Sequence, residues 1–225
     1  MFGKNPVRLP VKSDGSVLQV QEIFPTFQGE GPYVGWPAVF IRLGGCNLTC
    51  KFCDTEFESF EDFSVIDLLD KVKNLSQNKN GKQIRDLVVI TGGEPLRQPI
   101  EMLCQKLLEQ GYKVQIETNG TLFRALPKGV DIICSPKMSN GRYHVLRPDI
   151  LEQITALKFI VSVDHGDYQN VAEVGQAEYD IPVYVQPMDE LDSESNAKNL
   201  QHAVSLVDEY GYRLSLQTHK IVGVP

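Results

Sequence analysis

From residue 84 onward, the chain alternates short apolar and β-branched runs with longer stretches whose apolar residues recur at helical spacing. Strands that alternate with helices in this way form βα units around a parallel sheet. The predicted strands cover residues 86–91, 112–117, 130–134, 157–163, 183–186 and 213–217, preceded by strands over 18–24 and 38–43. The predicted helices cover residues 64–77, 100–110, 149–155, 170–177 and 195–210, the first with a capping-box-like start at Ser64 and Asp67. The pattern predicts an α/β fold.

The length of 225 residues, with 42% hydrophobic and 23% charged residues, is sufficient for one substantial core. We therefore expect a single domain over residues 1–225, with an N-terminal extension over 1–17 and a core over 18–225. No apolar run approaches the roughly 20 residues that a membrane helix requires, and the N-terminus does not read as a signal peptide. We expect a soluble, cytoplasmic protein without a membrane partner.

The charge balance argues against a nucleic-acid partner. The formal net charge is −7 and the sequence pI is about 5.2. Binding to nucleic acid needs a basic patch that displaces counterions from phosphates. Lysine and arginine are instead scattered along the chain, which favours a small-molecule substrate.

Three cysteines, Cys46, Cys50 and Cys53, lie within eight residues, and no further cysteine is near enough in sequence to complete a set of four. A closed structural metal site uses four protein ligands, whereas three thiolates on a [4Fe-4S] cluster leave one iron free to hold a reacting molecule. The alternative is zinc with a histidine as fourth ligand, although the nearest histidine in sequence is His144. Disulfides are a weaker alternative, because five cysteines in 225 residues is a low density.

The two remaining cysteines are predicted to be structural. Cys104 lies on the apolar face of a predicted helix, and Cys134 ends a predicted buried strand. Neither is expected to be a fourth ligand of the cluster.

Polar or glycine-rich turns follow four of the predicted strands. They are the segments 91–95, 117–120, 135–137 and 186–189, and the cysteine segment follows the strand over 38–43 in the same way. Loops at the carboxyl ends of the strands build the active site in barrel-like α/β folds. Each turn alone is ordinary loop chemistry, but together they predict one site, in which Gly92 and Gly93 let a ligand approach the backbone.

The cysteine spacing Cys46-x3-Cys50-x2-Cys53 resembles the signature of radical S-adenosylmethionine (SAM) enzymes, and the segment 92–95 resembles their motif for the methionine amino group. Within that superfamily, segments 24–31, 40–43, 53–55 and 216–220 resemble the 7-carboxy-7-deazaguanine synthases. The resemblance extends from about residue 18 to the C-terminus.

The resemblance implies an incomplete (β/α)6-like partial TIM barrel that holds a [4Fe-4S] cluster, SAM and Mg²⁺. It also implies a lyase of queuosine and 7-deazapurine biosynthesis. That enzyme converts 6-carboxy-5,6,7,8-tetrahydropterin into 7-carboxy-7-deazaguanine and releases ammonia, using the 5′-deoxyadenosyl radical made from SAM. An external electron donor such as flavodoxin and a homodimeric state are further expectations from the resemblance.

The resemblance also implies roles for individual residues. The expected cluster ligands are Cys46, Cys50 and Cys53, and Thr55 is the expected magnesium ligand. The expected cofactor-binding residues are Gly93, Glu94, Ser135, Pro136, Lys137, Gln186, Pro187, Met188 and Asp189. The expected substrate-binding residues are Phe27, Gln28, Gly29, Arg42, Thr91 and the terminal Pro225, and no side chain is assigned as a general acid or base.

Two other functions remain open at this point. An activase that places a glycyl radical on a partner protein would share the cysteine and Gly92–Pro95 motifs, but it would not need Gln28 or Arg42. A non-enzymatic module with zinc in the cysteine loop would be colourless, whereas an iron-sulfur protein is brown.

Overall fold

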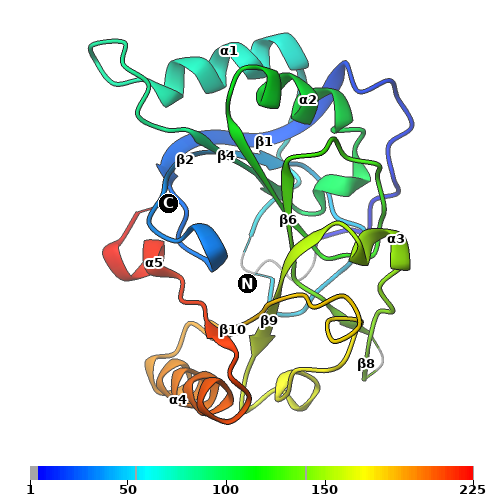
Figure 1. The fold of residues 1–225 in the computed structure, drawn as a ribbon, viewed down its shortest axis with the longest axis vertical. Coiled ribbons are helices and arrows are strands. Elements are labelled where there is room, and N and C mark those ends of the chain that lie inside the picture. Colours follow the sequence, from blue (N-terminus) through cyan, green and yellow to red (C-terminus); the bar gives the residue numbers. More distant parts are fainter. Residues whose placement is uncertain (1–4, 54, 140, 225) are drawn as a thin grey trace.

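A curved sheet of nine strands forms the centre of the molecule (Figure 1). The structure is a computed structural model and describes residues 5–53, 55–139 and 141–224. The strands are β1 (Val17–Phe27), β2 (Pro37–Leu43), β3 (Glu61–Ser64), β4 (Leu87–Gly92), β5 (Lys113–Thr118), β6 (Val130–Cys134), β9 (Ile154–Val161), β10 (Val183–Pro187) and β11 (Arg213–Leu214). The short strands β7 (Met138–Ser139) and β8 (Arg142–Tyr143) pair separately.

Most of the sheet is parallel, and its order is β11-β10-β9-β6-β5-β4-β2-β1-β3. Strands β2, β4, β5, β6, β9, β10 and β11 run parallel, in the order in which the chain forms them. At one end, β1 is antiparallel to both β2 and β3. Strands β3 and β11 are the two edges of the sheet, so the barrel does not close. This architecture confirms the predicted incomplete (β/α)6-like barrel.

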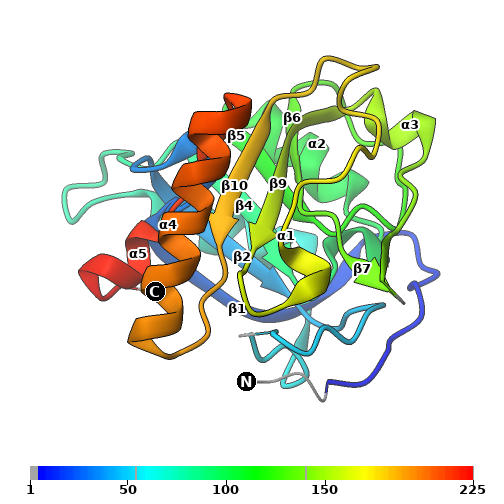
Figure 2. The same cartoon turned by 90° about the horizontal axis from the view of Figure 1, so that it is seen from below.

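Four helices pack on the outside of the sheet: α1 (Val65–Ser76), α2 (Glu101–Glu109), α3 (Pro148–Leu151) and α4 (Ser193–Tyr210). The short helix α5 (Thr218–Val222) lies instead at the open side of the barrel, against Gly29. Figure 1 shows α1 and α2 at one end of the sheet and α4 at the other, and Figure 2 shows α4 alongside β10. The predicted start of α1 is confirmed, because the Ser64 hydroxyl accepts a hydrogen bond from the Asp67 amide at 3.1 Å.

Alternation along the strands separates an apolar outer face from a partly polar inner face. Val114 and Ile116 of β5 join the core beneath the helices, as Leu157 and Phe159 of β9 do. Because side chains alternate along a strand, the intervening residues point to the opposite face. These residues include Gln115 and Glu117 of β5 and Lys158 of β9. The fold therefore places buried polar side chains inside the incomplete barrel.

Four of the predicted elements differ clearly from the structure, one of them the strand predicted over 157–163, which forms as Ile154–Val161. Residues 170–177 form no helix, because the 173–176 turn is held by side chains: Glu173 accepts from the Gly175 amide at 2.7 Å and Gln176 from the Val174 amide at 2.8 Å. The predicted helix over 149–155 ends at Leu151, since β9 already begins at Ile154. The last predicted strand ends at Leu214 instead of residue 217.

The predictions for the two isolated cysteines are confirmed, since Cys104 on α2 and Cys134 at the end of β6 are both fully buried. Within the ranges that the structure describes, no helix is both long and apolar enough to cross a membrane.

Replacing Gly175 with alanine is expected to destabilise the protein by about 1–3 kcal/mol. Gly175 has φ +122°, and an added Cβ would lie 2.5 Å from a Leu151 methyl carbon. The matched control is Gly166→Ala in the same connection, where an added Cβ meets nothing within 4 Å. Urea denaturation of the two variants checks the prediction, and equal losses of stability would contradict it.

Candidate active site

A cavity of about 240 Å³ opens at the carboxyl ends of the parallel strands. The cysteine loop after β2 forms one wall, and the loops after β4, β5, β6 and β10 complete it. The predicted site residues that line it are Cys46, Cys50, Cys53, Thr55, Thr91, Gly93, Ser135, Lys137, Gln186, Pro187, Met188 and Asp189. The structure thus brings the strand-end segments together as the sequence predicted.

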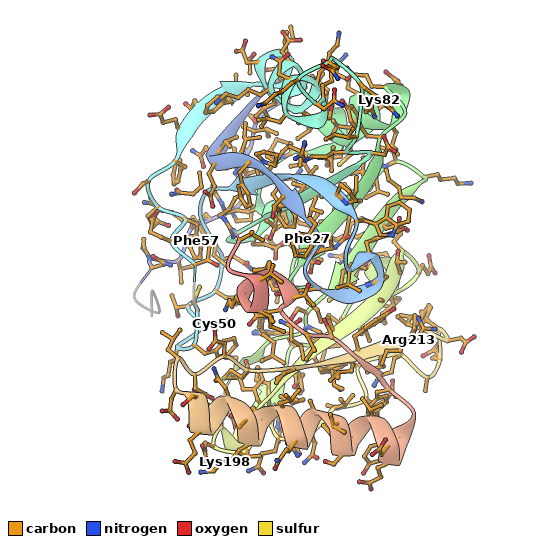
Figure 3. The ribbon with its side chains drawn as sticks, turned by 90° about the vertical axis from the view of Figure 1, so that its left-hand side faces the viewer. Phe27, Cys50, Phe57, Lys82, Lys198 and Arg213 are labelled. Carbon is orange, nitrogen blue, oxygen red and sulfur yellow. The ribbon has the colours of Figure 1, made fainter. Side chains whose placement is uncertain are left out.

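A second cavity, of about 300 Å³, adjoins the first. Phe27, Gln28 and Arg42 line it, and the two cavities share Thr55 and Thr91. Figure 3 shows Cys50 and Phe57 on the side of the cysteine loop, and Phe27 close to the short helix α5. The residues predicted for cofactor and for substrate therefore separate into two connected spaces.

The Gly92–Gly93 turn is packed directly against the start of the cysteine loop. A Cβ on Gly92 would lie 2.2 Å from the Leu43 carbonyl oxygen, and one on Gly93 would lie 2.3 Å from the Gly45 carbonyl oxygen. The Gly93 amide donates to Leu43 at 3.2 Å, and the Glu94 amide donates to Gly45 at 3.0 Å. The close approach that these glycines permit is made by the chain's own backbone, and both glycines also line the cavity.

Glu94 does not line either cavity, although it was predicted to bind cofactor. Its buried carboxylate accepts hydrogen bonds from Thr118 Oγ1 at 2.7 Å, the Asn119 amide at 2.8 Å and the Leu96 amide at 2.9 Å. Burial raises the pKa of Glu94, and these donors oppose the shift. Glu94 therefore fixes the shape of the glycine turn against the end of β5.

Pro136 also lies outside both cavity walls, between Ser135 and Lys137.

The three cysteine thiols fit a cluster better than a single metal ion. Among the described residues, no three side chains of His, Cys, Asp or Glu come close enough to hold one ion, yet all three thiols line the same cavity. The thiolates of a cluster bind different iron atoms, so they need not converge on one point. His144 lines a separate cavity, and no described histidine lines the one that holds the thiols, which removes the expected fourth ligand for zinc.

The three thiols differ in burial, since Cys46 is buried whereas Cys50 and Cys53 are half-buried. Burial raises the pKa of Cys46 to about 12, and burial also raises that of Cys50, against the nearby charge of Lys137. A positively charged metal centre would favour their thiolate forms. Lys137 is itself held in place by Ser135, because its Nζ donates to the Ser135 hydroxyl at 2.6 Å and to the carbonyl oxygen at 2.9 Å.

A buried charge cluster lies where the two cavities meet. Lys158 Nζ donates to Glu30 at 2.5 Å and to Glu117 at 2.9 Å. Burial alone would raise the pKa of Glu30, but the charge and hydrogen bond of Lys158 outweigh it and lower this pKa to about 2. Burial raises the pKa of Glu117, against the pull of Lys158. One ammonium group thus serves two carboxylates, and all three side chains line both cavities.

Two predicted substrate residues have structural partners. Gln28 is buried, donates to Glu117 at 3.3 Å and accepts from the Glu30 amide at 3.0 Å. Arg42 Nε donates to Glu22 at 2.7 Å, so the strand-end ion pair that a surface arginine would form is present, and Arg42 still lines the second cavity.

Gly29 is needed because the C-terminal segment packs on it. A Cβ on Gly29 would lie 2.1 Å from His219 Nδ1. The Thr218 amide and hydroxyl both donate to the Gly29 carbonyl oxygen at 3.0 Å. Gln217 donates to Glu30 at 2.9 Å, and Lys220 donates to Asp189 at 2.9 Å. Pro225, predicted to bind substrate, lies outside the described residues.

Five residues that line the first cavity were given no individual role from the sequence: Glu30, Glu117, Lys158, Asn119 and Gln217. Glu117 and Asn119 belong to the strand-end segment 117–120 that was predicted to contribute to the site. The available signal was a charged residue at an inward position of a predicted strand. Lys158 interrupts the apolar run over 156–161 at such a position, and Glu117 ends the predicted strand over 112–117; an unpaired charge at either place would be costly. Asn119 Nδ2 donates to Asn47 of the cysteine loop at 3.0 Å, which joins that loop to the end of β5.

Comparison with known proteins agrees with this geometry. The family model of the radical SAM superfamily matches residues 40–159. The chain is 58% identical over 224 residues to the 7-carboxy-7-deazaguanine synthase of Rickettsia prowazekii, covering 100% of this chain and 96% of that protein. It is 39% identical over 250 residues to the synthase of Rhodospirillum rubrum, covering 100% of both. The crystal structure of QueE from Escherichia coli superposes with a TM-score of 0.67 at 25% identity, covering 89% of this chain and 93% of that chain.

These matches define the chain first as a radical SAM protein, a class in which three cysteines hold a [4Fe-4S] cluster that binds SAM. More narrowly, it belongs to the 7-carboxy-7-deazaguanine synthase family. The predicted family, fold class and enzyme class are confirmed.

Replacing Lys158 with methionine is expected to destabilise the protein by about 3–5 kcal/mol at pH 7, because two carboxylates are left buried without a cation. The variant loses stability because Glu30 and Glu117 are ionised. Its difference from wild type in free energy of unfolding should therefore shrink as the pH falls from 7 towards about 4.5, where the two carboxylates take up protons. In wild type, the stabilisation from Glu30 has the opposite sign: it is present above pH 4.5 and is lost as the pH falls towards 2.

Chemical denaturation at several pH values measures both effects. Lys198→Met is the control, because Lys198 forms an exposed pair with Glu194, and it should leave stability nearly unchanged at every pH. If Lys158→Met also left stability nearly unchanged at every pH, the buried charge cluster would contribute nothing to stability.

Proposed function

We propose that this chain converts 6-carboxy-5,6,7,8-tetrahydropterin into 7-carboxy-7-deazaguanine and ammonia. The observation that carries the proposal is the pair of connected cavities. Three thiols line one, a guanidinium and a buried amide line the other, and Glu30, Glu117 and Lys158 lie where they meet. Membership of the synthase family supports the choice of substrate.

Cys46, Cys50 and Cys53 would hold the cluster. When bound, the [4Fe-4S] cluster supplies the electron that cleaves SAM to a 5′-deoxyadenosyl radical. The protein's own contribution is to keep the reacting atoms together and water out. Buried side chains around Cys46, including Phe57 and Asn119, provide this dry wall.

The loops after β4, β6 and β10 would bind SAM in the first cavity. Gly93 would present its backbone to the methionine part, and Glu94 would act through the shape of the turn. Ser135, Pro136 and Lys137, with residues 186–189, would surround the rest of the cofactor. Ser135 and Lys137 are already fixed to each other, so little ordering would be needed when SAM binds.

The second cavity would hold the pterin. Arg42 would meet its carboxylate with a planar guanidinium, and Phe27, Gln28 and Gly29 would form the opposite wall. Thr91 lines both spaces and would contact the substrate. Thr55 also lines both, and its hydroxyl would bind Mg²⁺ together with the substrate, as suits an ion that prefers oxygen ligands. Pro225 is the remaining proposed contact.

The proposal extends to the protein's surroundings. An external reductant such as flavodoxin would supply the electron, the protein would act as a homodimer in the cytoplasm, and residues 1–225 would form a single radical SAM domain. Neither nucleic acid nor membrane is a proposed partner.

The decisive experiment is anaerobic turnover of the reconstituted protein with SAM, Mg²⁺, reductant and the pterin, followed by mass spectrometry. Wild type should form the carboxydeazaguanine, and Cys50→Ala should form none. Thr55→Ala should need a higher Mg²⁺ concentration for half-maximal rate. Cys104→Ala removes a thiol that lies in the core, outside both cavity walls, and should retain the cluster.

Two outcomes would contradict the proposal. A colourless protein that binds zinc instead of iron would remove the radical chemistry. A brown protein that makes 5′-deoxyadenosine but leaves the pterin unchanged would keep that chemistry and remove the substrate, which would favour the activase.

A further inference from the structure

The N-terminal segment, residues 5–11, lies across the cysteine loop. Val7 pairs with Cys46 in a parallel β-bridge, and the Arg8 amide donates to the Cys46 carbonyl oxygen at 2.7 Å. Figure 2 shows the segment in blue along the outer edge of the molecule, next to the cyan loop. The backbone of the first cysteine is therefore held by residues that lie well outside the family's motifs.

The same segment also holds the far side of the loop. Asn5 Nδ2 donates to the Thr55 carbonyl oxygen at 3.1 Å, and Asn5 lines the cavity of the thiols. Arg8 donates to Glu58 through Nε at 3.0 Å and Nη2 at 2.6 Å, and its guanidinium carbon lies 5.9 Å from the centre of the Phe60 ring. The segment thus contacts the cysteine loop both at the first cysteine ligand, Cys46, and beyond the last one, Cys53.

The segment is itself fixed to the core. The Val11 amide donates to the Arg97 carbonyl oxygen at 2.8 Å, and Arg97 donates to the Leu9 carbonyl oxygen at 3.1 Å. Arg97 is buried, and it also donates to the Gly44 carbonyl oxygen at 2.9 Å. One arginine, just after the Gly92–Pro95 motif, therefore connects the segment to the start of the cysteine loop.

The loop has little regular structure of its own. The described residues between Cys46 and β3 form neither helix nor strand, so their shape depends on contacts with other segments. We propose that residues 5–11 brace the cysteine loop in the shape that retains the cluster, with Asn5 and Arg8 as positioning residues. This inference rests on the proposed function, because it requires the loop to hold a cluster.

The test compares reconstituted wild type with Asn5→Leu, Arg8→Ala and Arg8→Pro. Leucine keeps the approximate shape of asparagine without its donor, alanine removes the Arg8–Glu58 pair, and proline also removes the amide that donates to Cys46. Leu9→Ala is the matched control, because the Leu9 side chain is 81% exposed on the same segment. The measurements are the rate at which an iron chelator bleaches the cluster absorbance, the EPR spectrum of the reduced cluster with and without SAM, and the melting temperature of the cluster-free protein.

We expect bleaching about three- to tenfold faster for Asn5→Leu and Arg8→Ala, and faster still for Arg8→Pro. The EPR spectrum should change on SAM addition less than in wild type, while Leu9→Ala matches wild type in every measurement. Bleaching rates equal to wild type would overturn the brace. The brace would also be overturned if bleaching were faster only in variants whose cluster-free protein melts at a lower temperature, because the segment would then stabilise the protein in general. If wild type itself retains no cluster, the proposed function fails instead.

Discussion

The close packing of the Gly92–Gly93 turn on the backbone of residues 43–45 is the constraint on which the site depends. With a Cβ at either glycine the two backbones could not approach, since the nearest atoms would lie 2.2 and 2.3 Å away. This contact sets the cysteine loop against the end of β4. Glu94 then fixes the same turn to the end of β5 through Thr118 and Asn119. Three strand ends are thereby held together before any ligand binds, which is the preorganisation that positional catalysis needs.

The charge cluster of Glu30, Glu117 and Lys158 accounts for the division into two cavities. These side chains come from the β1–β2 connection, β5 and β9, so a single group of hydrogen bonds ties distant parts of the sheet across its inner face. One ammonium group is shared by two carboxylates here, so the cluster has no spare positive charge for an anionic ligand group. This arrangement supports the proposed contact of the pterin carboxylate with Arg42, which lines only the second cavity.

Much of the fold and of the site could be predicted from the sequence. Strands with uninterrupted apolar runs, such as Leu87–Ile90, were placed nearly to the residue, because burial on both faces permits little else. The prediction of a helix over 170–177 is wrong. The apolar residues there recur at helical spacing, but two local turns held by side chains and a glycine at φ +122° prevent a helix.

The described residues that were assigned to the site from sequence motifs line the cavities, except Gly29, Glu94 and Pro136. Glu30, Glu117 and Lys158 had no motif-based role. The inward positions of Glu117 and Lys158 were a local signal, but local sequence does not encode the pairing of these residues across β5, β9 and the connection after β1. The motif around Gly29 predicted a contact with substrate. In the structure, the close packing of His219 is what leaves no room for a side chain at this position.

The open barrel explains why the C-terminal segment reaches the site. Because β3 and β11 do not pair, the inner face lacks a closing strand on that side. The C-terminal segment spans part of this opening: the Ser215 hydroxyl accepts from the Gly31 amide at 3.0 Å and donates to Gln186 at 2.9 Å. Thr218 then binds Gly29. These contacts join β10, whose end lines the first cavity, to the loop after β1, which lines the second. The C-terminal segment therefore connects the walls of the two cavities.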